Sequence, residues 1–222
     1  MSALSEPARQ LAGETLADLP RRVRLVFFTQ TFGCETCYDQ HRLLQAVAEL
    51  SPSIVVEECN LVLDGARAAA YGVDRAPSIA IVALDEAGAE IDYGIRFVGL
   101  TAGYEFQSLV EGIRLVSRGE TDLSPSSQTA LATLTERATI QVFVTPTCAF
   151  CGSAVLLAYR IAIASPHVSA AAVEVSEFPD LIRQYRVNGV PKIVVNGRHD
   201  WLGQQTEETF VAEMVDRIAT SA

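Results

Sequence analysis

Cys34-Glu35-Thr36-Cys37 and Cys148-Ala149-Phe150-Cys151 decide the fold of this 222-residue chain. The two quartets lie 114 residues apart, and at that offset positions 31–79 align with positions 145–193 without a gap. Eleven of the forty-nine aligned pairs are identical, where average composition gives about three by chance. The chain therefore contains an internal repeat, and each copy holds one pair of cysteines three positions apart.

Each copy predicts the same order of elements: strand, helix, strand, helix, strand, strand, helix. β-branched and aromatic residues favour strands at 23–28 and 138–144, which lead directly into the cysteine pairs. Apolar residues then recur at helical spacing until a Ser-Pro at 51–52 or 165–166. The other predicted elements are strands at 54–60 and 168–175, helices at 63–71 and 178–185, strands opening at Pro77 and Pro191, a tight Asn196-Gly197 hairpin, a longer hairpin leading to a strand at 93–98, and final helices at 104–117 and 206–219.

These elements indicate an α/β fold of two units. Helices between the early strands imply parallel pairing, and the hairpins make the last two strands of each copy antiparallel. We expect two small mixed sheets with helices on both faces, and one additional helix before each copy, at 8–19 and 123–137. The segment 118–127 contains Gly, Ser and Pro, which places the predicted boundary between units 1–120 and 121–222.

The composition is that of an acidic globular protein. Hydrophobic residues make up 49% of the chain, and the net charge is −10 with a pI near 4.8. This acidity opposes binding to nucleic acid and to anionic membranes, because both attract clustered Lys and Arg. Residues 1–20 lack an apolar leader, and no run approaches about 18 apolar residues. We therefore expect a cytoplasmic protein with no nucleic-acid or membrane partner.

Four of the five cysteines form the two pairs, a pattern typical of redox chemistry or metal binding in a cytosolic chain. Unpaired backbone N–H groups and the helix dipole stabilise a thiolate at the start of a helix. We therefore predict that Cys34 and Cys148 are attacking thiols. Cys37 and Cys151 are the predicted resolving thiols of disulfide exchange. Glu35 places a negative charge beside Cys34, so the Cys148 thiol is expected to have the lower pKa of the two attacking thiols.

Each copy resembles the thioredoxin and glutaredoxin superfamily. The resemblance lies in a strand that leads into Cys-x-x-Cys at a helix start, and in a proline forty-three residues after the first cysteine. Two such copies, with Phe97-Val98-Gly99-Leu100-Thr101-Ala102-Gly103-Tyr104-Glu105-Phe106 after the first, look like the glutaredoxin-like protein disulfide oxidoreductases of archaea and bacteria, from about residue 19 to the C-terminus. The resemblance implies two tandem thioredoxin-like units, each a mixed four-stranded sheet flanked by helices.

The resemblance also implies residue roles and partners. In this family a cis-proline faces the redox pair, and the residue before it offers its backbone to an extended substrate. Carried over, the substrate-binding residues are Ala76 with Pro77 and Val190 with Pro191. The second copy has the usual Gly-Val-Pro form, whereas Arg75-Ala76-Pro77 departs from it. The implied activity is thiol–disulfide exchange with protein disulfides, with a thioredoxin-reductase-like enzyme or glutathione as electron donor and with no cofactor or metal.

Other kinds of site stay open from the residues alone. Four cysteines in two pairs could bind zinc, although zinc ribbons separate their pairs by about 15 to 20 residues. An iron–sulfur cluster has no support beyond the cysteines. A Cys–His hydrolase has little support, because no histidine is spaced informatively from a cysteine; the three are His41, His167 and His199. Cys59 lies in a predicted apolar strand and is expected to be a small buried side chain.

Two functional alternatives also stay open. The first is a dedicated electron carrier for a flavoprotein or peroxidase partner. It resembles the N-terminal domain of alkyl hydroperoxide reductase flavoproteins, which keeps only one redox pair, whereas this chain has two. The second is a non-catalytic binding module that kept the thioredoxin fold. Two intact cysteine pairs at predicted helix starts argue against it.

Overall fold

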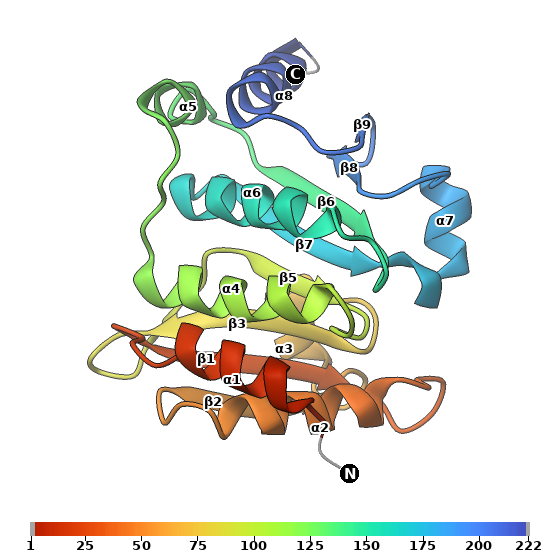
Figure 1. Ribbon diagram of the computed structural model, residues 1–222. Coiled ribbons are helices and arrows are strands. Elements are labelled where there is room, and N and C mark those ends of the chain that lie inside the picture. Colours follow the sequence, from red (N-terminus) through yellow and green to blue (C-terminus); the bar gives the residue numbers. More distant parts are fainter. Residues whose placement is uncertain (1–2, 221–222) are drawn as a thin grey trace.

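One continuous sheet runs through the molecule, with helices packed on both of its faces (Figure 1). The computed structural model describes residues 3–220, and within them the strand order is β2-β1-β3-β5-β7-β6-β8-β9, with β4 paired to β3. The strands of the first half of the chain lie on one side of this sheet and those of the second half on the other. The N- and C-terminal ends therefore lie on opposite sides of the molecule (Figure 1).

The elements repeat the same order in the two halves. The first half contains α1 (Glu6–Thr15), β1 (Arg22–Thr29), α2 (Cys37–Ala48), β2 (Ile54–Asn60), α3 (Gly65–Ala70), β3 (Ser78–Leu84), β4 (Glu90–Ile91), β5 (Ile95–Val98) and α4 (Glu105–Arg118). The second half contains α5 (Pro125–Leu131), β6 (Ala138–Val144), α6 (Cys151–Ala164), β7 (Val168–Glu174), the 3-10 helix η1 (Val175–Glu177), α7 (Pro179–Tyr185), β8 (Lys192–Val195), β9 (His199–Leu202) and α8 (Glu207–Thr220).

The pairing within each half follows the sequence prediction. β1 pairs in parallel with β2, and β6 pairs in parallel with β7. β3 and β5 are antiparallel, as are β8 and β9. Asn196 and Gly197 both adopt positive φ angles in the tight turn between β8 and β9, where the Arg198 amide donates to the Val195 carbonyl. Positive φ angles at both central residues are typical of a turn that matches the twist of a hairpin. The predicted α/β fold of two thioredoxin-like units is confirmed.

The prediction of two separate small sheets is wrong. β5 pairs in parallel with β7, from Ile95 opposite Ala170 to Val98 opposite Val173, and this pairing joins the two halves into one sheet. The contact is made by backbone groups of strands far apart in the chain, so it leaves no periodic signal in the sequence. The helix expected at 123–137 is also shorter than predicted, because α5 ends at Leu131.

The hydrophobic core supports the same conclusion. On one sheet face a single cluster extends through both halves, from Leu4 near the N-terminus to Ile218 in α8. Tyr159 of α6 is fully buried in this cluster and donates a hydrogen bond to the backbone carbonyl of Arg96 in the first half, at 2.8 Å. The opposite face has two separate clusters, one under α3 and one under α7. The two units therefore share one core on the face that carries α4 and α6.

A close backbone approach joins the first half to the second cysteine pair. The amide of Tyr104 donates a hydrogen bond to the carbonyl of Pro146, which lies two residues before Cys148. Gly103 has a φ angle of 62°, and a Cβ atom there would lie 2.2 Å from the Pro146 oxygen. Only glycine fits this position, because a side chain would meet both an unfavourable φ and a backbone atom.

Gly103→Ala is therefore expected to lower the free energy of unfolding by about 2–3 kcal/mol, because backbone strain and a steric clash add. Urea unfolding followed by circular dichroism measures the change. Gly88→Ala is the matched control, since Gly88 also has a positive φ angle, 84°, but a Cβ atom there would meet nothing within 4 Å. Equal losses of about 1 kcal/mol in the two variants would show that the contact with Pro146 contributes nothing.

Candidate redox site

The first cysteine pair lies where β1 ends and α2 begins. Cys34 and Cys37 form a disulfide with a Cα–Cα distance of 5.5 Å. Cys37 is the first residue of α2 and is only 6% exposed, whereas Cys34 is half-buried on the preceding loop. Only the first sulfur of the pair is therefore placed where a substrate could approach it.

The second pair repeats this arrangement between β6 and α6. Cys148 and Cys151 form a disulfide with the same Cα–Cα distance, 5.5 Å. Cys151 is the first residue of α6 and is 0% exposed, whereas Cys148 is half-buried. The backbone amide of Cys148 donates to the carbonyl of Thr145, so a tight turn precedes the helix.

The two predicted prolines lie beside these pairs at the same end of the sheet. Both the Ala76-Pro77 and the Val190-Pro191 peptide bonds are cis. Phe28, near the end of β1, is opposite Ser78, so Pro77 lies next to the strand that leads to the first pair. In the same way Phe143 is opposite Lys192, which places Pro191 beside the strand that leads to the second pair. The substrate-binding role of Ala76, Pro77, Val190 and Pro191 stays a prediction.

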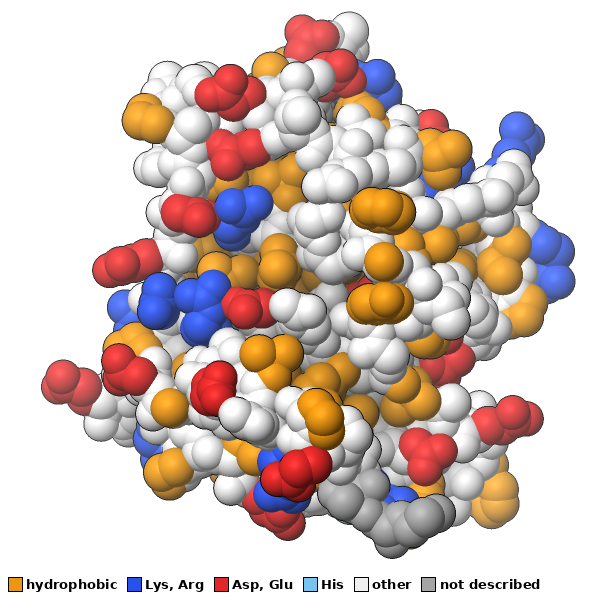
Figure 2. Space-filling model, viewed as in Figure 1, with side chains coloured by type: hydrophobic (Ala, Val, Ile, Leu, Met, Phe, Trp, Pro, Cys, Tyr) orange, Lys and Arg blue, Asp and Glu red, His pale blue; other side chains and the backbone are white. Residues whose placement is uncertain are grey.

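Exposed aromatic side chains surround both pairs. Phe32 precedes Cys34 and is 86% exposed, and Tyr38 follows Cys37 and is also exposed. Phe150 is exposed between the cysteines of the second pair, and Tyr104 is exposed at the start of α4. Hydrophobic side chains gather over the ends of α4 and α6 where these helices begin (Figure 2). Such surfaces favour contact with apolar side chains of another chain.

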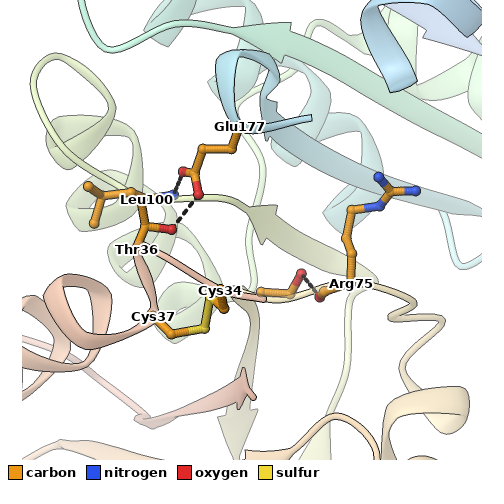
Figure 3. The surroundings of a disulfide bond; sticks show 7 residues. Cys34, Thr36, Cys37, Arg75, Leu100 and Glu177 are labelled. Carbon is orange, nitrogen blue, oxygen red and sulfur yellow. Dashed lines mark hydrogen bonds between the residues drawn. A yellow bond between two sulfur atoms is a disulfide. The ribbon is translucent and has the colours of Figure 1, made fainter. Parts of the chain in front are cut away.

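The second unit contributes to the surroundings of the first pair. Glu177, the last residue of η1, accepts hydrogen bonds from the hydroxyl of Thr36 and from the backbone amide of Leu100 (Figure 3). Arg75, directly before Ala76, forms an ion pair with Asp180 of α7 at 3.2 Å. Residues 177–180 of the second unit therefore contact both loops of the first site.

A buried carboxyl group lies near the second pair. Glu105 is the first residue of α4, follows the Tyr104 that binds Pro146, and is fully buried. Among residues 3–220 neither of its carboxylate oxygens has a hydrogen-bond partner. Ser108, one turn along α4, has its hydroxyl oxygen 3.4 Å from the position of a Cβ atom on Gly152, the residue after Cys151. Burial raises the pKa of Glu105 to about 7; the Ser108 hydroxyl, which lies close by without hydrogen-bond geometry, opposes the increase, and the nearby carboxyl group of Glu174 adds to it.

The sequence alone assigned no role to Glu105 or Glu177. Glu105 does appear in the segment that supports the resemblance, but its burial depends on the packing of α4 against α6. Glu177 lies 140 residues from Cys37 in the chain, and the two come together through contacts between the units, among them the pairing of β5 with β7. Neither residue has a local pattern that indicates its surroundings.

Cys59 is buried and free, as predicted. It is 5% exposed and packs in the cluster under α3. Burial raises the pKa of its thiol, and the neighbouring Glu57 adds to the increase. A thiol with a raised pKa is a poor nucleophile at neutral pH.

Within residues 3–220, no three His, Cys, Asp or Glu side chains group in a way that could hold a metal ion. Each cysteine of the two pairs is instead joined to its neighbour in the same pair. Across the same described range, every helix is too short or too polar to span a membrane.

Comparisons with known proteins agree with this arrangement. A family model described as a thioredoxin domain matches residues 138–216. The crystal structure of a protein disulfide oxidoreductase from Aeropyrum pernix K1 is 31% identical, with 97% of this chain and 94% of that chain covered and a TM-score of 0.85. The alkylhydroperoxide reductase AhpF of Enterococcus faecalis V583 is 30% identical, with 95% and 99% covered and a TM-score of 0.85.

The first of the curated relatives are longer proteins. The corresponding alkyl hydroperoxide reductase of Pseudomonas putida is 27% identical over 182 residues, which are 82% of this chain and 31% of that protein. The chain spans about a third of the length of the curated relatives it matches, among them an NADH dehydrogenase of Bacillus subtilis, of which 32% is covered. The tandem fold, the two disulfides and the 31% identity with the Aeropyrum protein, of which 94% is covered, place this chain among the protein disulfide oxidoreductases with two thioredoxin-like units.

Proposed function

We propose that this protein exchanges disulfides with protein substrates through both cysteine pairs. The observation that carries the proposal is the same in the two units: a half-buried cysteine precedes a buried cysteine that begins a helix. An attacking thiol must reach a substrate, and a resolving thiol must reach only its neighbour. Cys34 and Cys148 therefore attack, and Cys37 and Cys151 resolve. The units that contain them are 1–120 and 121–222.

The exchange proceeds in two steps at each site. The thiolate of Cys148 attacks one sulfur of a substrate disulfide, a mixed disulfide forms, and the other substrate sulfur leaves as a thiolate that takes a proton from water. The thiolate of Cys151 then attacks the Cys148 sulfur, which forms the Cys148–Cys151 disulfide and releases the second substrate thiolate. Two electrons pass from the protein to the substrate. Cys34 and Cys37 perform the same steps in the first unit.

Glu105 serves the second of these steps. The thiol of Cys151 is fully buried, so it needs a nearby group to take its proton before it attacks. A carboxyl group with a pKa of about 7 accepts and returns a proton near neutral pH. The buried Glu105, placed beside Ser108 at the α4–α6 contact, is our candidate for this group.

The substrate lies as an extended segment against the cis-proline loops. Ala76 and Val190 present backbone groups next to Pro77 and Pro191, at the end of the sheet that carries the cysteines. The exposed aromatic residues beside the pairs provide apolar contacts to the same segment. Recognition through backbone groups suits an enzyme that accepts unrelated protein chains.

A flavoprotein reductase supplies the electrons. The similarity to the alkylhydroperoxide reductase AhpF supports this choice over glutathione, because this chain resembles the N-terminal domain of such flavoproteins. A reducing compartment such as the cytoplasm suits the cycle, since the dithiol forms must be regenerated after each turnover.

The second candidate function is a dithiol electron carrier for one dedicated flavoprotein or peroxidase. The identity of 30% with AhpF of Enterococcus faecalis over 95% of this chain favours it. The two functions differ in substrate range: a dedicated carrier reduces its partner but not unrelated protein disulfides.

Reduction of insulin disulfides by dithiothreitol tests the proposal. Wild-type protein should accelerate the reaction, Cys34→Ser and Cys148→Ser should each retain the activity of the other site, and the double variant should lose all acceleration. Activity that persists in the double variant would contradict the assignment of the attacking thiols. An inactive wild type that is nevertheless reduced by a flavoprotein reductase would favour the dedicated carrier.

A further inference from the structure

We propose that Glu177 of the second unit is a positioning residue for the first redox pair, and that its carboxylate makes the Cys34–Cys37 pair less acidic and more reducing than it would otherwise be. The inference rests on the proposed disulfide exchange and deepens it. It gives the two cysteine pairs different chemistry, although they share one sequence pattern.

The contact is direct and enters the redox loop itself. Thr36 lies between Cys34 and Cys37, and its hydroxyl donates a hydrogen bond to Oε2 of Glu177 (Figure 3). Oε1 accepts the backbone amide of Leu100 at 2.5 Å. One carboxylate therefore fixes both the residue between the cysteines and the segment that follows β5.

The segment that carries Leu100 is held to the same helix by a second contact. The side chain of Gln40, one turn along α2 from Cys37, is fully buried. Its Oε1 accepts the backbone amide of Thr101 at 2.8 Å, and its Nε2 donates to the Thr101 hydroxyl at 3.1 Å. Thr101 is thus bound directly to α2 through Gln40. Leu100 is linked to the start of the same helix through Glu177 of the second unit, which binds both Leu100 and Thr36.

A further bridge from the same segment reaches the other loop of the first site. The guanidinium group of Arg75 forms an ion pair with Asp180 at 3.2 Å and lies 5.2 Å from the ring centre of Phe178. Arg75 directly precedes Ala76 and the cis-proline Pro77. Residues 177–180 therefore fix the cysteine loop and the proline loop relative to each other.

The second redox pair has no counterpart of this contact among the described residues. At the repeat offset of 114 residues, Glu177 corresponds to Leu63, which is 84% exposed. Thr36 corresponds to Phe150, whose side chain is exposed and has no hydroxyl. The asymmetry arises because β5 pairs with β7, so η1 and α7 lie against the first site while the equivalent segment of the first unit lies at the far end of the sheet.

The sign of the effect follows from charge. Thr36 is the residue before the first turn of α2, so a carboxylate bound to it lies at the positive end of the helix dipole that would otherwise stabilise the Cys34 thiolate. Other titratable and charged groups on the elements around this pair are Glu35 and Asp39 beside the cysteines, His41 and Arg42 further along α2, Glu174 on β7, and Arg75 with its partners Asp74 and Asp180. Arg42 lies over the ring of Tyr38. The acidic groups outnumber the two guanidinium groups, and Glu177 contacts the redox loop directly.

A thiolate beside negative charge is less stable, whereas a disulfide carries no charge to repel. The dithiol form of the first pair is therefore disfavoured relative to its disulfide, which means that the pair gives up electrons more readily. The second pair lacks this carboxylate, so the expected order is a more reducing Cys34–Cys37 and a more acidic Cys148.

Glu177→Gln tests the inference, because glutamine keeps the size of the side chain and removes the charge. Its Oε1 can still accept the Leu100 amide, and its Nε2 can donate to the Thr36 hydroxyl oxygen in place of the bond that Glu177 accepts. In a background of Cys148→Ser and Cys151→Ser, the rate of Cys34 alkylation by iodoacetamide at pH 6 should rise about three- to tenfold, since one nearby charge shifts a thiol pKa by about 0.5–1 unit. At about pH 9, where the Cys34 thiolate is populated, the equilibrium of the pair with dithiothreitol should move toward the reduced form by about three- to tenfold, and tenfold equals about 30 mV for two electrons.

Asp180→Asn is the matched control, because it removes a negative charge from the same segment but breaks only the bridge to Arg75. Thr36→Val is a second variant that leaves the charge in place and removes the donor. A pH profile of alkylation that is unchanged in Glu177→Gln, or shifted equally in Asp180→Asn, would overturn the inference. Alkylation of Cys148 in a Cys34→Ser, Cys37→Ser background should be insensitive to Glu177→Gln.

These measurements use small reagents and no protein substrate. If wild-type protein failed to reduce insulin, the proposed function would fail while the alkylation and equilibrium results could still stand. If insulin reduction succeeded and the Glu177→Gln shifts were absent, only the role of Glu177 would be lost.

Discussion

Cys151→Ser protein is expected to accumulate as a covalent complex with its protein substrate, and its turnover at the second site should fall about 100-fold or more. The buried Cys151 sits next to the attacking sulfur, so it resolves the mixed disulfide as an intramolecular nucleophile, which raises the local concentration of the attacking group by several orders of magnitude. Serine cannot replace it, since a hydroxyl group is too weak a nucleophile. Non-reducing electrophoresis after mixing with oxidised insulin detects the complex.

The first site must be silent for this result to be interpretable. The experiment is therefore carried out in a Cys34→Ser, Cys37→Ser background, and Cys148→Ser in the same background is the control. If Cys148 is the attacking thiol, the control forms no complex. A complex that forms through Cys151 when Cys148 is absent would reverse the assigned roles. It would mean that the buried Cys151, and not the half-buried Cys148, attacks the substrate.

Glu105→Gln is expected to slow disulfide exchange at the second site by about 100-fold, which is typical for the loss of a positioned acid–base group. The rate of the wild type should rise with pH through about 7, the pKa to which burial raises Glu105, and this dependence should be absent from the variant. Stopped-flow measurement of substrate release from pH 5 to 9 separates the two proteins. Glu111→Gln, on the same helix but paired with Arg114, is the control and should keep the wild-type profile.

The same substitution should alter the pH dependence of stability. The folded-state pKa of about 7 exceeds the ordinary value of 4.5, so between these values the folded protein binds more protons than the unfolded chain. The free energy of unfolding of the wild type therefore falls as the pH rises through this window. From about pH 5 to about pH 8 the variant should gain about 2–3 kcal/mol relative to wild type. Parallel stability curves would mean that Glu105 is ionised in the folded protein.

The sequence predicted the units of this fold because its strongest signals are local and repeated. The offset of 114 residues aligns both cysteine pairs and both prolines, and the strands and helices between them have clear periodicity. The cis state of the Ala76-Pro77 and Val190-Pro191 bonds agrees with the family resemblance. Residues within about 45 positions of a cysteine could therefore be placed from sequence alone.

What the sequence did not predict depends on contacts between the units. The pairing of β5 with β7 uses backbone groups, and any pair of small or apolar strands could satisfy it. Glu177 and Glu105 look like ordinary acidic residues until that pairing brings η1 to the first redox loop and packs α4 against α6. The residue type Glu does not by itself indicate whether the carboxyl group is exposed or buried.

The shared sheet also determines what happens when the chain is divided. A cut between α4 and α5 would separate β5 from β7 and leave each half with an open row of backbone donors and acceptors along an apolar strand. Open strand edges of this kind recruit other chains and promote aggregation. Each half would also uncover part of the continuous core, including the ring of Tyr159. We therefore expect each half of the chain to depend on the other for solubility, even if each cysteine pair can exchange disulfides independently.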